Sequence, residues 1–239
     1  LYDDGVAAGA PSFPRSDDGH PRLLAADRDP WSVHRETERS TSASRYGVDL
    51  TAAVDSTLFS YDPARARLAE RTRGALDRPV VLAALSRVDL DSYVNLAVTV
   101  DRLAERVLPA VEAQLADADV RDVDHERTAL AEDLRGVQRT YDLSGTMAMP
   151  AFETDVAGGV ARVAGFDLDV GGVLALWKAD VDTVYLLGGV YPADAVTRTA
   201  TATAEGPNGE PRTVDREVTV EFEPERYREA VLALLERPA

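Results

Sequence analysis

The stretch GVLALWKADVDTVYLLGGVYP, residues 172–192, carries the strongest indication of fold in this sequence. Residues 172–177 and 183–191 are nearly all apolar, as is typical of strands that are covered on both faces. The polar residues between them, 178–182, predict the tip of a hairpin. We therefore expect these two strands to pair in the core of the protein.

Alternating polar and apolar residues predict further strands on both sides of this hairpin. The alternation covers residues 46–58, 137–149 and 160–170. Residues 80–90 are apolar but few, so a strand or a buried turn of helix fits them equally well. Two Thr-rich runs, residues 197–204 and 214–222, flank a Gly-Pro-Asn-Gly turn and predict an exposed, extended hairpin.

Helices are predicted from capping residues and from apolar side chains at helical spacing. They begin at Asp62, Asp101, Asp124 and Pro224. The first should end before Pro79, and Pro109 should kink or divide the second. The apolar side chains expected to be buried are Leu103, Val107, Leu108, Val111 and Leu115 in the second helix, Leu130 and Leu134 in the third, and Tyr227, Val231, Leu234 and Leu235 in the last.

This order of elements predicts an α+β fold in which an antiparallel, meander-like sheet packs against two or three helices. An exposed hairpin and a terminal helix, residues 193–239, extend from this body. Residues 1–29 contain Asp pairs, prolines and glycines without a sustained period, so we expect a flexible or loosely docked acidic arm. Residues 30–239 should then form a single domain.

The charge of the chain is strongly one-sided. Its 239 residues include 42 Asp and Glu against 26 Lys and Arg, which gives a formal net charge of −16. Lys178 is the single lysine, so the other 25 basic residues are arginine, and isoleucine is absent. This composition is typical of an extreme halophile, whose carboxylates hold a hydrated, cation-rich shell in concentrated salt. We therefore interpret most acidic clusters as solvated surfaces that gather solvent cations.

The same composition argues against several classes of protein. Without cysteine the chain has no disulfide framework, zinc ribbon, iron–sulfur site or cysteine nucleophile. The acidic surface argues against binding to nucleic acid, although screening in molar salt weakens this argument. No run approaches about 18 apolar residues and no signal peptide is visible, so we expect no transmembrane segment. An acidic surface suits a salt-rich cytoplasm; the alternative is a cell-surface protein whose anchor, upstream of Leu1, has been removed.

Candidate catalytic and metal-binding residues are few. His125 lies among acidic residues, but no second histidine is spaced to share a zinc ion with it, which favours an ordinary surface role. The Asp cluster at residues 117–124 lacks the ligand pattern of a calcium-binding loop. Neither Ser86 nor Ser144 lies in a Gly-x-Ser-x-Gly elbow, and the glycine pairs do not form a phosphate-binding loop. We expect no cofactor, no metal site and no catalytic residue, and an enzymatic activity stays open.

One basic residue differs from the others because Arg87 lies within an apolar stretch. Such an arginine needs a carboxylate or carbonyl partner, or an edge position from which its guanidinium reaches water. An ion-paired structural role is favoured over a ligand-binding one. For a ligand pocket between sheet and helices, the expected wall residues are Arg87, Tyr141, Trp177 and Tyr185.

Three short motifs resemble a family of uncharacterised haloarchaeal proteins. They are Ser-Arg-Val-Asp at residues 86–89, Leu-Ala-Leu-Trp at 174–177 and Gly-Gly-Val-Tyr-Pro at 188–192. Trp31 matches an early tryptophan of that family, and the resemblance covers residues 31–192. The family implies no established activity and no catalytic residues.

The favoured hypothesis is a non-enzymatic accessory or interaction module that docks on a larger assembly, with a protein partner or a second copy of itself. The alternative is a small-ligand-binding or hydrolytic domain with a pocket between sheet and helices. An open pocket at Arg87 and the aromatic residues would favour the alternative. Packed and ion-paired side chains there would favour the interaction module.

The halophilic composition makes a prediction about stability. At low salt the carboxylates repel one another over longer distances, so we expect the chain to be folded only in concentrated salt. Circular dichroism across a potassium chloride series measures this dependence. A chain that stays fully folded at low ionic strength would contradict the halophilic interpretation.

Overall fold

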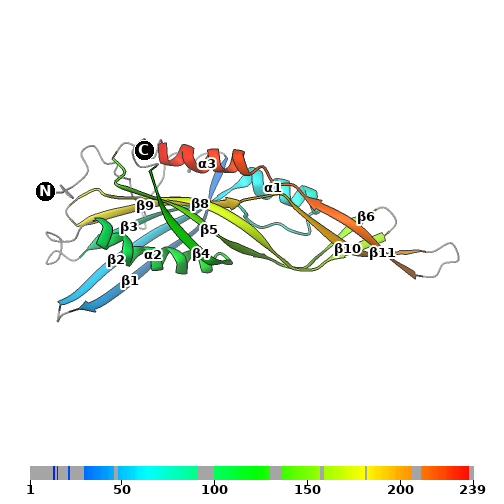
Figure 1. Cartoon of the computed structure of the whole chain (residues 1–239), viewed down its shortest axis with the longest axis horizontal. Helices are drawn as coiled ribbons and strands as arrows, with labels where there is room; N and C mark the ends of the chain where they lie inside the picture. The colour runs from blue at the N-terminus through cyan, green and yellow to red at the C-terminus, as the bar shows by residue number, and fades with distance from the viewer. Residues whose placement is uncertain are drawn as a thin grey trace.

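The computed structural model describes residues 13, 15, 21, 30–45, 48–90, 100–129, 136–156, 159–180, 182–205 and 211–236. It confirms an α+β fold with two antiparallel sheets and three helices in the described part of the chain. The molecule is elongated, and the smaller sheet extends from one end of the larger one (Figure 1).

The large sheet has seven strands in the order β1-β2-β3-β9-β8-β5-β4. Their bounds are β1 Trp31–Arg45, β2 Val48–Tyr61, β3 Leu82–Leu90, β4 Val120–Thr128, β5 Arg139–Met149, β8 Phe166–Lys178 and β9 Thr183–Pro192. The apolar hairpin expected from the sequence is confirmed as β8 and β9, which lie in the interior of the sheet. Every residue of β9 is buried.

The small sheet has four strands in the order β11-β10-β7-β6. Their bounds are β6 Phe152–Val156, β7 Gly159–Val163, β10 Val196–Glu205 and β11 Pro211–Val220. Strands β10 and β11 form the hairpin predicted near the end of the chain, paired from Val196 with Val220 out to Glu205 with Pro211. The Gly-Pro-Asn-Gly turn between them lies outside the described residues.

The helices explain why β9 and residues 172–177 of β8 are apolar on both faces. They are α1 Asp62–Arg71, α2 Val100–Ala116 and α3 Pro224–Glu236. Side chains of Leu174 and Leu186 face Leu115 of α2 across a narrow space. On the opposite face, Val231 of α3 lies against Gly189 of β9. The large sheet is therefore the middle layer between α2 and α3.

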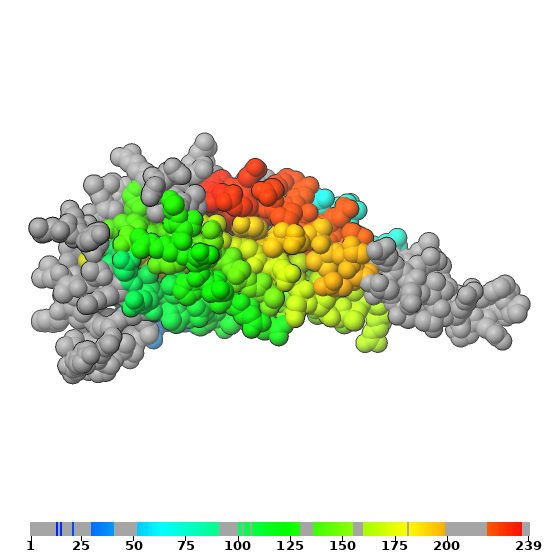
Figure 2. All heavy atoms as spheres, viewed as in Figure 1, coloured from blue at the N-terminus to red at the C-terminus, as the bar shows by residue number. Residues whose placement is uncertain are grey.

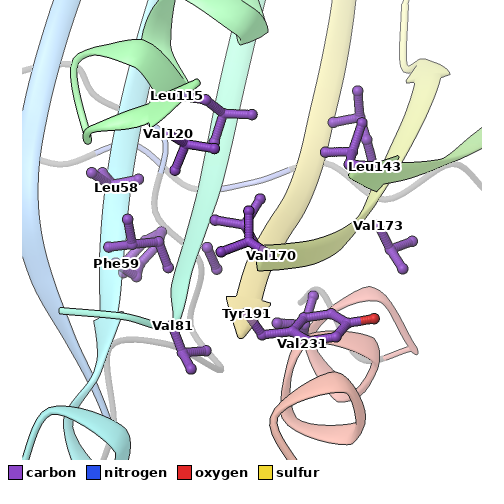
Figure 3. Close-up of a cluster of buried hydrophobic side chains, with 14 of the residues drawn as sticks. Leu58, Phe59, Val81, Leu115, Val120, Leu143, Val170, Val173, Tyr191 and Val231 are labelled. Carbon is purple, nitrogen blue, oxygen red and sulfur yellow. The ribbon is translucent and has the colours of Figure 1, made fainter. Parts of the chain in front are cut away.

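Figure 3 shows a cluster of buried hydrophobic side chains of the core, with Val231 of α3 beside Tyr191 of β9. Figure 2 shows α3, in red, seated directly on the strands along one side of the body. The apolar stripe predicted for this helix is confirmed, because its members Tyr227, Val231, Leu234 and Leu235 are all buried. Burial of this stripe holds α3 on the sheet.

One predicted helix is wrong. Residues after Asp124 continue β4, an edge strand that pairs with β5. The acidic side chain that suggests a helix cap instead accepts a hydrogen bond from the backbone N–H of the next residue, His125, at 2.8 Å. An edge strand with mostly exposed side chains has no apolar alternation to reveal it. Leu130 and Leu134, expected in this helix, lie outside the described residues.

Other boundaries also differ from the expectations. Strand β1 is polar, and the sequence analysis did not predict it. Residues 80–90 resolve into β3, and residues 160–170 divide between β7 and β8. Lys178, expected in a polar hairpin tip, belongs to β8 and is buried. Pro109 lies inside α2 without dividing it.

The glycines of β8 and β9 allow close approach between the strands. A Cβ atom at Gly172 would lie 2.6 Å from the carbonyl oxygen of Gly189, whereas one at Gly171 would lie 3.5 Å from the ring of Tyr191. The first distance is too short for a carbon atom, and the second is an ordinary contact. The two neighbouring positions therefore tolerate a side chain very differently.

We predict that Gly172→Ala lowers the free energy of unfolding by about 1–3 kcal/mol, because the strands must shift to admit the methyl group. The matched change Gly171→Ala should leave the stability equal to or slightly above wild type, because alanine restricts the unfolded chain. Denaturant unfolding at constant salt measures both values. Equal losses for both variants would contradict the close-approach argument.

Candidate functional site

The structure brings three of the four expected pocket residues together. Trp177 of β8 pairs with Tyr185 of β9, and Tyr185 pairs in turn with Arg87 of β3. Because directly paired residues of neighbouring strands point to the same face, these side chains share one face of the large sheet. Tyr141 of β5 pairs with Leu174, which lines the opposite face beneath α2. Tyr141 is therefore not part of the same site.

Phe13 of the N-terminal arm covers the aromatic side chains at this site. The rings of Trp177 and Tyr185 stack at an angle of 28° with their centroids 5.9 Å apart. Phe13 lies against both, 4.9 Å from Tyr185 in an edge-on arrangement and 5.8 Å from Trp177. All three side chains are buried, with relative exposures of 6% for Phe13, 1% for Trp177 and 3% for Tyr185.

A carboxylate on the same face is held by several hydrogen bonds. Arg87 donates from its Nε to both carboxylate oxygens of Asp89, at 2.8 and 3.0 Å, and the Thr183 hydroxyl donates to Oδ1 at 3.0 Å. Arg15 of the arm donates from its Nη2 to Oδ2 at 3.0 Å. We call Asp89, Trp177 and Tyr185 the arm-binding site.

Arg87 plays the ion-paired role that was favoured for it. Burial alone would lower the pKa of its guanidinium, but the hydrogen bond and the negative charge of Asp89 outweigh this effect and raise the pKa. The guanidinium is therefore charged, and its Nε and Nη2 atoms contact the carboxylate of Asp89 on the same strand. In this environment Arg87 positions the carboxylate of Asp89 on the face of the sheet.

Phe13 and Arg15 are the contact residues that the sequence analysis missed. A single phenylalanine in a segment rich in Asp, Gly and Pro is the signal that could have drawn attention to it. The expectation of a loosely docked arm covers residues 1–29, of which the structure describes Phe13, Arg15 and Pro21. Pro21 also contacts the sheet, because its carbonyl oxygen accepts a hydrogen bond from the Thr57 hydroxyl at 2.8 Å.

Tyr141 lies on the other face, near the edge of the sheet. Its ring centroid is 5.9 Å from that of His125, and burial followed by the charge of Asp101 raises the pKa of its phenol. The Nδ1 atom of His125 lies 3.5 Å from a carboxylate oxygen of Glu112. These contacts link β4 and β5 to α2, which agrees with a structural role for His125.

The space between α2 and the sheet is small. It has a volume of about 30 Å³ and a lining that is almost entirely apolar, including Leu58, Leu143 and Leu186. Ser86 and Gln114 are its polar members. Ligand pockets usually measure roughly 300–1,000 Å³, so this space is an order of magnitude too small for a metabolite.

A larger groove of about 460 Å³ lies between α1 and the first turn of α3. Its lining residues are Pro63, Ala66, Arg67, Glu70, Arg71 and Arg226. The arginines are already paired with carboxylates. The Nη1 atoms of Arg67 and Arg226 lie 2.5 and 3.0 Å from the two oxygens of Glu223, and Arg71 Nη2 lies 3.3 Å from Glu221. The groove is therefore an ion-paired helix junction.

Among the described residues, no group of three or more acidic or histidine side chains is arranged to hold a metal ion. No helix in the described part of the chain has the length and apolarity needed to cross a membrane. No protein-family model, curated protein or solved structure matches this chain.

The pairing of Glu223 makes a prediction about pH dependence. Hydrogen bonds from Arg67 and then Arg226 hold the pKa of this carboxyl below its ordinary value of 4.5. The ion pairs therefore contribute their full stability above about pH 4.5, and this contribution disappears as the pH falls through the lowered pKa. We expect Glu223→Gln to be less stable than wild type near pH 7, and the difference to vanish in acid.

Denaturant unfolding of both proteins at several pH values measures this difference. Glu225→Gln is the matched control, because it removes a charge from the same turn of α3 and Glu225 has no ion pair with another described residue. A constant difference between Glu223→Gln and wild type from pH 7 down to acid would contradict the assignment.

Proposed function

We propose that this protein is a non-enzymatic interaction module of an extreme halophile that docks on a larger assembly. A strand of the partner would pair with the edge of the small sheet in this protein. The observation that carries the proposal is the free edge of β11. Among the described strands β11 pairs only with β10, and the hairpin projects beyond the body of the molecule (Figure 1). An exposed row of backbone N–H and C=O groups is the usual acceptor for a partner strand.

The other sheet edges of the described chain are less suited to strand addition. The pairing of β1 shifts register between Val33 and Arg35, and that of β4 shifts between Arg121 and Asp124. Such irregularities interrupt an edge and twist it away from a second chain. Strand β6 has only five residues. By contrast, all ten residues of β11 pair with β10 without a shift.

The packed state of the arm-binding site also supports an interaction module over a pocket enzyme. Arg87 is ion-paired with Asp89, and Trp177 and Tyr185 are covered by Phe13. The alternative, a small-ligand-binding or hydrolytic domain, has less support because the space beneath α2 measures only about 30 Å³. The proposed halophilic origin and cytoplasmic location rest on the composition, and the proposed haloarchaeal kinship rests on the three short motifs.

The proposal is tested by purifying the tagged full chain from its native cells in multimolar salt and identifying the proteins that co-elute. Binding of each purified candidate is then measured for wild type and for two proline variants, Val214→Pro and Asp215→Pro. Neighbouring N–H groups of a strand point to opposite edges, so one proline removes a bond within the hairpin and the other removes a donor on the free edge.

One of the two variants, the one whose lost N–H points to the free edge, should keep the stability of wild type. We expect this variant to bind the partner about tenfold more weakly, because it loses a backbone hydrogen bond to the partner strand and adds a bulky ring at the edge. A chain that elutes alone and monomeric would overturn the interaction module. A partner that binds both folded variants as tightly as wild type would overturn strand addition at β11.

A further inference from the structure

We propose that the arm-binding site is a peptide-binding site for segments in which an aromatic residue is followed, two positions later, by a basic residue. In this structure the chain's own arm occupies the site through Phe13 and Arg15. The proposed class of ligand therefore follows from the two arm residues, Phe13 and Arg15, that contact the site in this structure. The inference adds a second contact surface to the proposed interaction module, and it concerns the end of β8 and β9 remote from the small sheet.

The receptor half of the site belongs entirely to the large sheet. The stack of Trp177 on Tyr185 follows from the register of β8 with β9. The Asp89 carboxylate is oriented by Arg87 on its own strand and by Thr183 on β9. Since none of these contacts involves the arm, the sheet presents a preformed aromatic surface next to an oriented carboxylate. Preformed sites bind with a smaller loss of conformational entropy.

The arm half of the site is described at Phe13 and Arg15. Phe13 supplies an edge-on ring contact with Tyr185, and Arg15 supplies one hydrogen bond to Asp89. Phe13 and Arg15 both contact the sheet, and side chains two residues apart point to the same side when a peptide binds in an extended conformation. Aromatic residues and arginine are also the residues that most often carry binding energy at protein interfaces.

The contact between Arg15 and Asp89 distinguishes this site from a purely apolar surface. The side chains are partly exposed, at 40% for Arg15 and 34% for Asp89, so water and ions reach the pair. Phe13, in contrast, is almost fully buried. The aromatic residue therefore provides most of the buried area, and the basic residue selects the orientation and sequence of the segment.

Occupation by the arm lowers the affinity for any segment that arrives from outside. A segment in trans binds only the fraction of molecules whose site is open, so its apparent dissociation constant equals the intrinsic constant divided by the open fraction. Weakening the arm should therefore strengthen binding in trans. This reciprocal effect separates a binding site from a contact that only stabilises the fold.

The experiment uses the full chain and a fluorescein-labelled peptide with the sequence of residues 9–17, GAPSFPRSD. Binding is followed by fluorescence anisotropy at a salt concentration at which the protein is folded. We expect the Phe13→Ala protein to bind the peptide about tenfold more tightly than wild type, as for a site that the arm closes for nine-tenths of the time. A second variant, Arg15→Glu, should also bind more tightly because its charge repels Asp89.

Two controls report on sequence specificity. A peptide with alanine in place of its phenylalanine should bind neither variant. Asp89→Asn, introduced together with Phe13→Ala, should weaken binding of the original peptide but not of a peptide whose arginine is replaced by glutamine, which isolates the Arg–Asp contact. Circular dichroism shows which variants are folded, and Arg15→Glu provides the test if Phe13→Ala unfolds.

Folded variants that bind the peptide no more tightly than wild type would overturn the proposal, as would equal binding of the alanine peptide. A wild-type dimer that Phe13→Ala converts to monomers would identify the arm of a second copy as the occupant in solution, which supports the site. The strand-addition proposal at β11 uses a different probe and different variants. Failure of either proposal therefore leaves the other to be judged on its own experiment.

Discussion

The close pairing of β8 with β9 is the constraint on which the rest of the structure depends. Strand β9 is buried along its whole length and β8 from Gly172 to Lys178, so these stretches need helices or other cover on each side of the sheet. Glycines at 172, 188 and 189 let the two backbones and their neighbours approach closely. From this centre, β5 and β4 follow on one side and β3, β2 and β1 on the other. Phe13 and α3 lie against one face, and α2 lies against the other.

Arginine–carboxylate pairs join elements that are far apart in the sequence. Arg39 of β1 contacts Asp117 just after α2, Arg139 of β5 contacts Asp101 of α2, and Arg67 of α1 contacts Glu223 before α3. Each exposed pair contributes little alone. Arginine suits this use because its planar group can form two hydrogen bonds with one carboxylate. Many of the arginines that the composition contains therefore tie together elements that are far apart in the sequence.

The sequence predicted what depends on local pattern and missed what depends on neighbours. Strands β8 and β9, α2 and α3 were predictable because their apolar side chains recur with the period of the element. The edge strands β1 and β4 carry mostly polar residues, and only the backbone of an adjacent strand makes them strands. Of the expected pocket residues, Tyr141 shares no face with Arg87 because the faces depend on the register among β3, β9, β8 and β5. The sequence around Phe13 has no periodic pattern, so its contact with Trp177 could not be predicted.

The strand order pairs elements that are distant in the sequence. Strand β3 pairs with β9, although α2 and strands β4 to β8 lie between them in the chain. The first three strands can form a local antiparallel unit early, but the inner edge of β3 stays open until β9 has been synthesised. Phe13 is separated even further in the sequence from its ring partners, which belong to β8 and β9. Such distant pairings slow folding. Strand β3 ends at Leu90 and β9 begins at Thr183, so an apolar strand edge stays unpaired while the segment between them is made, and such exposed edges favour aggregation.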